Sequence, residues 1–176
     1  MRLLRATRCT LEPLLEAHAA EMFGVLSDPA IYEFENAPPP SSQWLAERYR
    51  RLEARGPGDG SEQWLNWAVR LPGGEMAGYV QATVLPASLA YVAYELGSSH
   101  WRQGIGSSAV RAMLEELRAQ HGVRSFVAVL KAANFRSEAL LRSLGFEIGS
   151  AAQQSQHRDE PDELVMVRQA GTGPAA

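Results

Sequence analysis

The stretch HWRQGIGSSAV, residues 100–110, places two glycines and two serines where an amphipathic helix is expected to begin. Glycine in a helix lowers stability by roughly 0.5–1 kcal/mol relative to alanine. The presence of Gly104 and Gly106 at this position therefore calls for an explanation. The first turn of a helix carries N–H groups without intrahelical acceptors and a partial positive charge. A turn with little side-chain bulk therefore lets an anionic group, such as a phosphate, reach the backbone.

Three interpretations of this turn remain in competition. The glycines can serve only a tight turn and close helix packing. GIGSSA also fits the dinucleotide fingerprint G-x-G-x-x-A, but that fingerprint follows the first strand of a βαβ unit and precedes an acidic residue, which RSFVAVL (124–130) lacks. A P-loop is excluded because G-x-x-x-x-G-K-[ST] does not occur. The third interpretation is a site for the pyrophosphate of coenzyme A.

A second stretch, NFRSEALLRSLGFEIG (134–149), carries polar residues at the start of another helix. Asn134 stands where an N-cap is preferred, and Ser137 follows three residues later. Gly145 suits the left-handed residue that ends a helix. A cap alone would explain Asn134, and a solvated helix position would explain Ser137.

The rest of the sequence predicts an α+β chain around one sheet. Apolar residues at a spacing of three and four predict helices, and alternating residues between the turns PGGE and PAS predict an antiparallel meander. The polar connection 150–161 is expected to be irregular, and we expect one domain over 1–169 with a disordered tail at 170–176. The predicted helices cover 10–27, 43–55, 105–120 and 134–144, and the predicted strands cover 2–8, 64–71, 76–85, 89–96, 125–130, a start at 145–146, and 162–168.

The composition is that of an ordinary globular protein. The chain has 176 residues, 45% of them hydrophobic, and a net charge of −3 without a basic stripe, so nucleic acid is not an expected partner. Its single cysteine, Cys9, excludes an internal disulfide. No apolar run approaches the ~20 residues that span a bilayer, and no secretory signal is recognisable. The histidines lack metal-ligand spacing. A cytoplasmic protein without membrane or metal partners is therefore expected.

Together, the two stretches resemble the GNAT superfamily of acetyl-CoA-dependent N-acetyltransferases. The family signature Q/R-x-x-G-x-G/A falls on residues 101–106, with Trp101 in place of the usual Arg or Gln. The family pattern N-x-x-S-x-x-L followed by G-F falls on residues 134–146. Trp101 with SDPAIY (27–32), APPPS (37–41) and the terminal DELVM strand is similar to the RimJ/RimL branch of ribosomal-protein N-terminal acetyltransferases. The resemblance covers about residues 2–169.

The resemblance implies the GNAT acyl-CoA N-acyltransferase fold: a mostly antiparallel sheet, splayed between strands 4 and 5 and flanked by about four helices. The pantetheine arm of acetyl-CoA would lie in the gap. The implied cofactor-binding residues are Leu96, through its backbone, Arg102, Gln103, Gly104, Ile105, Gly106 and Ser107, through their amides, and Asn134 and Ser137.

The implied reaction is direct attack of an amine on the thioester, which requires a proton acceptor and stabilisation of the leaving thiolate. For the thiolate we expect Ser137, because the tyrosine used elsewhere in the superfamily has no counterpart and residue 141 is Leu. For the proton we expect Glu95, the only carboxylate on the fourth strand, which lies on the face opposite Tyr94 and Leu96. A solvated or ion-paired strand residue explains Glu95 equally well. The alternatives for the base are His100 and a water chain, and Glu33, Glu35 and Asn36 are candidates for the acceptor site.

The expected function is thus an N-acetyltransferase that acts on a primary amine. The alternatives are a coenzyme A-binding module without turnover and a nicotinamide-dependent enzyme. The acceptor stays open among protein N-termini, amino acids, polyamines, aminoglycosides and other small amines, because segments 28–42 and 150–161 are poorly patterned. The resemblance also makes a homodimer possible.

Overall fold

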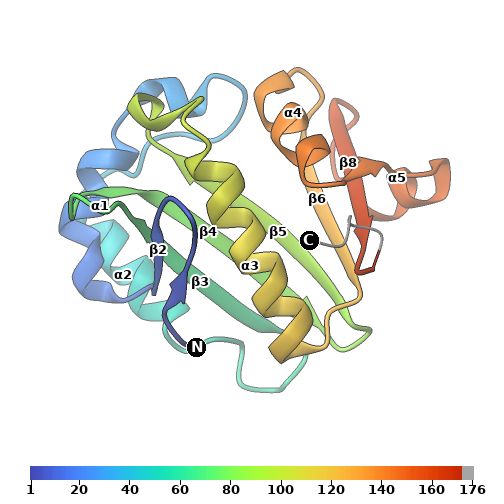
Figure 1. Ribbon diagram of the computed structural model, residues 1–176, viewed down its shortest axis with the longest axis horizontal. Coiled ribbons are helices and arrows are strands. Elements are labelled where there is room, and N and C mark those ends of the chain that lie inside the picture. The colour runs from blue at the N-terminus through green and yellow to red at the C-terminus, as the bar shows by residue number, and fades with distance from the viewer. Residues whose placement is uncertain (172–176) are drawn as a thin grey trace.

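An eight-stranded sheet organises the computed structural model, which describes residues 1–171 (Figure 1). The strand order is β1-β2-β3-β4-β5-β6-β8-β7, and every pair is antiparallel except β5–β6. The strands are β1 (Leu4–Arg5), β2 (Thr10–Pro13), β3 (Gln63–Arg70), β4 (Met76–Leu85), β5 (Leu89–Leu96), β6 (Ser125–Lys131), β7 (Glu147–Ile148) and β8 (Glu163–Gln169). The α-helices are α1 (Ala19–Leu26), α2 (Ser42–Leu52), α3 (Ile105–His121), α4 (Phe135–Ser143) and α5 (Ala151–His157). The predicted fold class is confirmed, with five rather than about four α-helices among the described residues.

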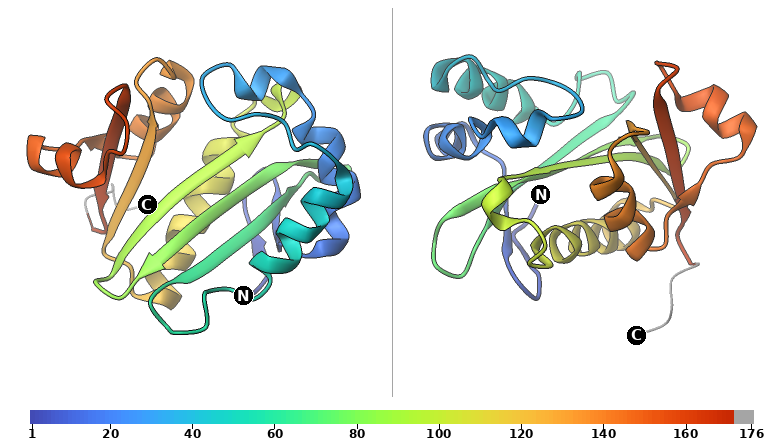
Figure 2. Two further views of the ribbon diagram at one scale, coloured as in Figure 1. Left: turned by 180° about the vertical axis from the view of Figure 1, so that it is seen from behind. Right: turned by 90° about the horizontal axis from the view of Figure 1, so that it is seen from above.

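Helices cover both faces of the central strands. Figure 2 shows α1 and α2 on one face of the sheet and α3 on the other. The α3 face buries an apolar cluster that includes Trp67, Met113 and Phe126, while Met22 and Leu45 belong to the cluster beneath α1 and α2. Burial of such side chains, at about 25 cal/mol per Å² of apolar surface, fixes both layers on the sheet. Each face of the sheet therefore packs against its own helix layer.

Strands β5 and β6 separate along their length. Their parallel pairing is confined to Leu89–Ser125, Ala90–Phe126 and Tyr91–Val127, and beyond Tyr91 the two strands diverge (Figures 1 and 2). Residues 92–96 of β5 consequently have no strand partner on that edge within the described part of the chain. The predicted splay between the fourth and fifth strands is confirmed, and it leaves backbone groups free to bind a ligand.

Two predictions about the N-terminal third are wrong. The helix expected from residue 10 begins only at Ala19, after a 3-10 turn at Glu16–His18. Residues 10–13 instead form β2, which pairs with β3 from Thr10–Arg70 to Pro13–Trp67. The strand expected at 2–8 is reduced to β1, which forms a hairpin with β2. Pairing with β3, a contact distant in sequence, outweighs the helical spacing of the apolar residues.

The C-terminal third also differs from expectation. The connection expected to be irregular contains α5, whose N-cap Ser150 and Gln153 form a reciprocal capping box. Gln154 anchors this helix, because its side chain donates to the Val165 carbonyl at 2.7 Å and accepts from the Val165 N–H at 3.0 Å. Of the tail predicted at 170–176, residues 172–176 lie outside the described residues. No helix in residues 1–171 has the length and apolar character needed to cross a membrane.

Candidate active site

A cavity of about 960 Å³ follows the gap between β5 and β6 and continues under α2. The first turn of α3 and the start of α4 line one part of it, and α2 with segment 31–40 lines the other. The two stretches singled out in the sequence therefore meet in one cavity. The predicted site residues that line it are Glu95, Leu96, Arg102, Gly104, Ile105, Gly106, Ser107, Asn134 and Ser137; Glu35, Asn36 and His100 line it as well.

The local structure at the start of α3 favours glycine at both positions. Gly104 is the N-cap and has φ +72°, in the left-handed region that favours glycine. A Cβ on Gly106 would lie 2.9 Å from Leu140 Cδ1 and 3.0 Å from Leu96 Cδ1, so only glycine fits without displacing them. Both glycines therefore serve a tight turn and close packing. This role is compatible with anion binding, because the N–H groups of this turn have no acceptor in a preceding turn.

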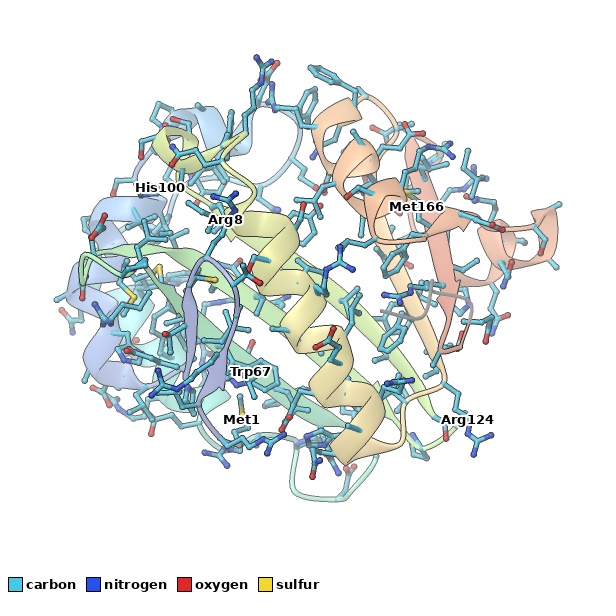
Figure 3. All side chains as sticks on the ribbon, viewed as in Figure 1. Met1, Arg8, Trp67, His100, Arg124 and Met166 are labelled. Atoms are coloured by element: carbon cyan, nitrogen blue, oxygen red, sulfur yellow. The ribbon has the colours of Figure 1, made fainter. Side chains whose placement is uncertain are left out.

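Gln103 and Arg8 differ from what the sequence suggested. Gln103 does not line the cavity, and its side chain donates to the Ser99 carbonyl at 2.7 Å. Arg8, which the sequence analysis missed, lies beside the start of α3 (Figure 3), with its Nε 3.1 Å from the position of a Cβ on Gly104. Its backbone N–H donates to Ser108 Oγ at 3.1 Å. The β1–β2 hairpin thus brings an exposed cation to the turn.

The backbone of Leu96 points into the gap. Gly97 N–H donates to Ala77 O on β4 at 2.9 Å, so the N–H and C=O of the preceding residue point to the opposite edge. The Leu96 carbonyl accepts from Trp101 Nε1 at 2.8 Å, which leaves the Leu96 N–H for a ligand. Trp101, the departure from the family signature, therefore has a structural role at the edge of the gap.

Three polar side chains meet at the start of α4. Asn134 Oδ1 accepts from the Ser137 N–H at 3.1 Å, which confirms the N-cap. Ser137 Oγ lies 2.8 Å from Tyr94 Oη, a partner on β5 that the sequence analysis left without a role. Burial raises the pKa of Tyr94 to about 12, so its hydroxyl stays protonated at neutral pH. The Tyr94–Ser137 pair is a hydrogen-bond donor in the gap.

Glu95 faces the other side of β5, as strand alternation predicted. It is opposite Tyr79 in the β4–β5 register, and no ion pair holds it within residues 1–171. Burial raises the pKa of the Glu95 carboxyl, and the Tyr79 hydroxyl partly opposes this shift. Burial also raises the pKa of Glu35 across the cavity. A partly desolvated carboxylate in a cavity is a candidate general base.

Arg136 joins the two sides of the cavity mouth. Its guanidinium carbon lies 5.0 Å from the ring centre of Phe34, 4.6 Å from that of Trp101 and 5.2 Å from that of Phe135. It also pairs with Glu33, which does not line the cavity. These contacts tie segment 33–34 to α4, although the residues are about a hundred positions apart in sequence.

Comparisons with known proteins agree with this geometry. The family profile described as "Acetyltransferase (GNAT) domain" matches residues 8–147. The structure is similar to RimL, the ribosomal L7/L12 α-N-protein acetyltransferase, in complex with coenzyme A (TM-score 0.80, 18% identity, 96% of this chain and 98% of that one). It is also similar to Mycobacterium smegmatis RimJ in complex with a CoA-disulfide (TM-score 0.81, 17% identity, 99% and 90%). A third similar structure is the ribosomal-protein-S5-alanine acetyltransferase of Vibrio fischeri (TM-score 0.77, 14% identity, 98% of each chain). No curated protein matches the sequence.

Proposed function

The chain belongs to the GNAT acetyltransferases, and from this premise we propose that it transfers an acetyl group from acetyl-CoA to a primary amine. One observation carries the proposal. Glu95 and the Tyr94–Ser137 pair lie on opposite sides of the same strand end and line one cavity, which begins at the bare first turn of α3. A proton acceptor and a proton donor are thereby available on two sides of one reaction centre.

The residues present fit coenzyme A. The N–H groups of Ile105, Gly106 and Ser107 suit the pyrophosphate, and Arg8 and Arg102 supply positive charge beside them. The free N–H of Leu96 suits an amide of the pantetheine arm. When bound, acetyl-CoA supplies the acetyl group in activated form, as a thioester.

The reaction moves two protons off the nitrogen: one leaves the ammonium before attack, and the second leaves as the amide forms, while the thiolate takes up one proton when the C–S bond breaks. Glu95, when ionised, accepts a proton from the ammonium of the acceptor and so makes the amine nucleophilic. Tyr94 Oη and Ser137 Oγ share one hydrogen bond, so one hydroxyl of the pair donates to the other and the second donates toward the negative charge that develops on the departing sulfur.

An amine panel tests the function. Purified protein with acetyl-CoA and each amine should release free thiol, and mass spectrometry should find the acetylated amine. A coenzyme A-binding module would release no thiol with any amine. A nicotinamide enzyme would be stabilised by NAD and not by coenzyme A in a thermal-shift assay, where a ligand at 100 times its Kd adds about 2.7 kcal/mol.

The Tyr94–Ser137 pair predicts a non-additive loss. We expect Ser137→Ala and Tyr94→Phe each to lower kcat about tenfold with little change in KM for acetyl-CoA, because the interaction strengthens only as charge develops. The double variant should lose no more than either single variant, since the two hydroxyls act as one unit. Ser143→Ala, which removes a hydroxyl bonded to the Leu140 carbonyl on the same helix, is the control. Additive losses would contradict the shared role.

Arg8 predicts a smaller effect on cofactor binding. We expect Arg8→Gln to raise the Kd for coenzyme A several-fold, because an exposed cation near the pyrophosphate contributes modestly, and the difference should shrink at high salt. Arg5→Gln removes an exposed charge from the same hairpin and should leave the Kd unchanged. Calorimetric titrations at two ionic strengths measure both. An equal effect of the two variants would indicate only a general charge effect.

A further inference from the structure

The part of the cavity under α2 contains polar side chains without hydrogen-bond partners in the described residues. Asn66 on β3 is only 6% exposed, yet its carboxamide has no hydrogen bond within residues 1–171. Gln81, directly opposite it on β4, also lacks one. The Tyr49 hydroxyl on α2 is buried and unpaired. A buried polar group is almost always satisfied, so the buried Tyr49 hydroxyl, together with two unpaired carboxamides that line the same cavity, points to a polar ligand.

Arg48 adds a positive charge to this group. It lies on α2 and lines both the main cavity and an adjoining one of about 140 Å³ over β3 and β4, together with Asn66 and Gln81. Its guanidinium lies 5.9 Å from the ring centre of Trp44. No carboxylate lies within ion-pair distance of Arg48 in residues 1–171, although its charge acts at longer range to lower the pKa of Glu95. We call Arg48, Tyr49, Asn66 and Gln81 the α2 pocket.

The cavity therefore has an acidic part and a basic part. Glu95 and Glu35 line it near the end of β5, whereas Arg48 is in the α2 pocket. Gln81 is opposite Ala93, two residues before Glu95, so the two sites are about 7 Å apart along the strands. A ligand with an ammonium at one end and an anion at the other matches this separation of charge.

We propose that the acceptor is an amine that carries a carboxylate, with the ammonium at Glu95 and the carboxylate in the α2 pocket. This inference rests on the proposed function and names its substrate class. A guanidinium binds a carboxylate through two parallel hydrogen bonds, and the two carboxamides can donate further ones. An α-amino acid is too short, because its two charged groups share one carbon. A dipeptide, or a peptide N-terminus followed by an acidic residue, has the required length.

Matched acceptor pairs test the proposal. Alanyl-alanine is compared with alanyl-alaninamide, and a C-terminally amidated peptide that begins Ala-Asp with one that begins Ala-Asn. We expect kcat/KM for the carboxylate member of at least one pair to exceed that of its partner about tenfold. The pair that shows the preference identifies the source of the carboxylate, a free C-terminus or an acidic side chain.

Variants on α2 connect the preference to the pocket. Arg48→Gln should reduce the ratio of kcat/KM between the two members of the pair to about twofold or less, while the KM for acetyl-CoA stays unchanged. Arg51→Gln removes an equal charge from the same helix at a position that does not line the cavity, and it should keep the preference. Calorimetry of the same compounds with the protein saturated in coenzyme A gives a readout independent of turnover. In this titration, Arg48→Gln should raise the Kd of the compound with the carboxylate about tenfold and leave the Kd of its uncharged partner unchanged.

The outcomes separate this inference from the proposed function. Equal use and equal binding of both members of each pair, or a preference that survives Arg48→Gln, would overturn the α2 pocket and leave the acetyltransferase intact. If no amine is acetylated, the proposed function fails. In that case carboxylate binding that depends on Arg48 would still support the pocket as an anion site, and its absence would overturn that too.

Discussion

Glu95→Gln should lower kcat at neutral pH by about a hundredfold or more, which is the usual contribution of a positioned general base. Gln keeps the shape of the side chain and its contact with Tyr79, but it cannot accept a proton. Binding of acetyl-CoA should stay unchanged, since Glu95 faces the side of β5 opposite Leu96 and the gap. Steady-state kinetics with the best amine of the panel, together with a coenzyme A titration, measure both quantities.

The effect of pH on Glu95 distinguishes a base from a structural residue. Burial raises the pKa of Glu95 in the folded protein, so the folded state holds this proton more tightly than the unfolded state does. The stability that Glu95 contributes is therefore present at acid pH and lost as pH rises through the folded pKa. Glu95→Gln should consequently unfold with an equal or higher free energy at pH 7, and this gain should vanish below about pH 4. Loss of activity with a gain in stability is the expected pattern.

Glu35→Gln is the matched control for Glu95→Gln. Glu35 also lines the cavity, and burial raises its pKa in the same direction. It belongs to the segment after α1 rather than to β5, so we expect its replacement to raise the KM for the amine more than it lowers kcat. If Glu35→Gln abolished turnover while Glu95→Gln kept it, the role of base would pass to Glu35. A wild-type acid limb of kcat/KM unchanged in Glu95→Gln would contradict the assignment as well.

The sequence predicted the parts of the site that depend on local chemistry. Asn134 is the N-cap of α4 and Gly145, with φ +82°, is the left-handed residue after that helix, and both are constraints that a single residue reveals. Strand alternation also placed Glu95 and Leu96 on opposite faces correctly. These features need only the residue, its neighbours and a periodicity.

The sequence could not predict contacts made by distant segments. Tyr94 Oη meets Ser137 Oγ across the gap, 43 positions along the chain, and Arg8 reaches Gly104 only because the β1–β2 hairpin folds beside α3. The α2 pocket depends on the register that sets Asn66 opposite Gln81. The helix predicted over 10–27 is wrong at its start for the same reason, because pairing with the distant strand β3 decides the conformation of residues 10–13.

Gly104→Val should raise the Kd for coenzyme A about a hundredfold, because a branched side chain at the N-cap keeps phosphate oxygens from the N–H groups of the turn, and hydrogen bonds to a charged group contribute about 1.5–3 kcal/mol each. The substitution also strains the backbone, so it needs a matched control. Gly122 ends the same helix with φ +66°, and a Cβ there would meet nothing within 4 Å. Gly122→Val should thus lower the free energy of unfolding about as much as Gly104→Val does, and it should leave the Kd for coenzyme A unchanged.

A truncated donor separates loss of the phosphate contacts from general damage to the site by Gly104→Val. Acetyl-pantetheine has the thioester and the pantetheine arm but no pyrophosphate, so Gly104→Val and the wild type should use it with similar kcat/KM. Because the side-chain-poor turn of α3 would then matter only to the donor that carries phosphates, the result would assign the turn to the pyrophosphate. An equal loss with both donors, or an equal loss of coenzyme A affinity in Gly122→Val, would show that the glycine serves only the turn and its packing.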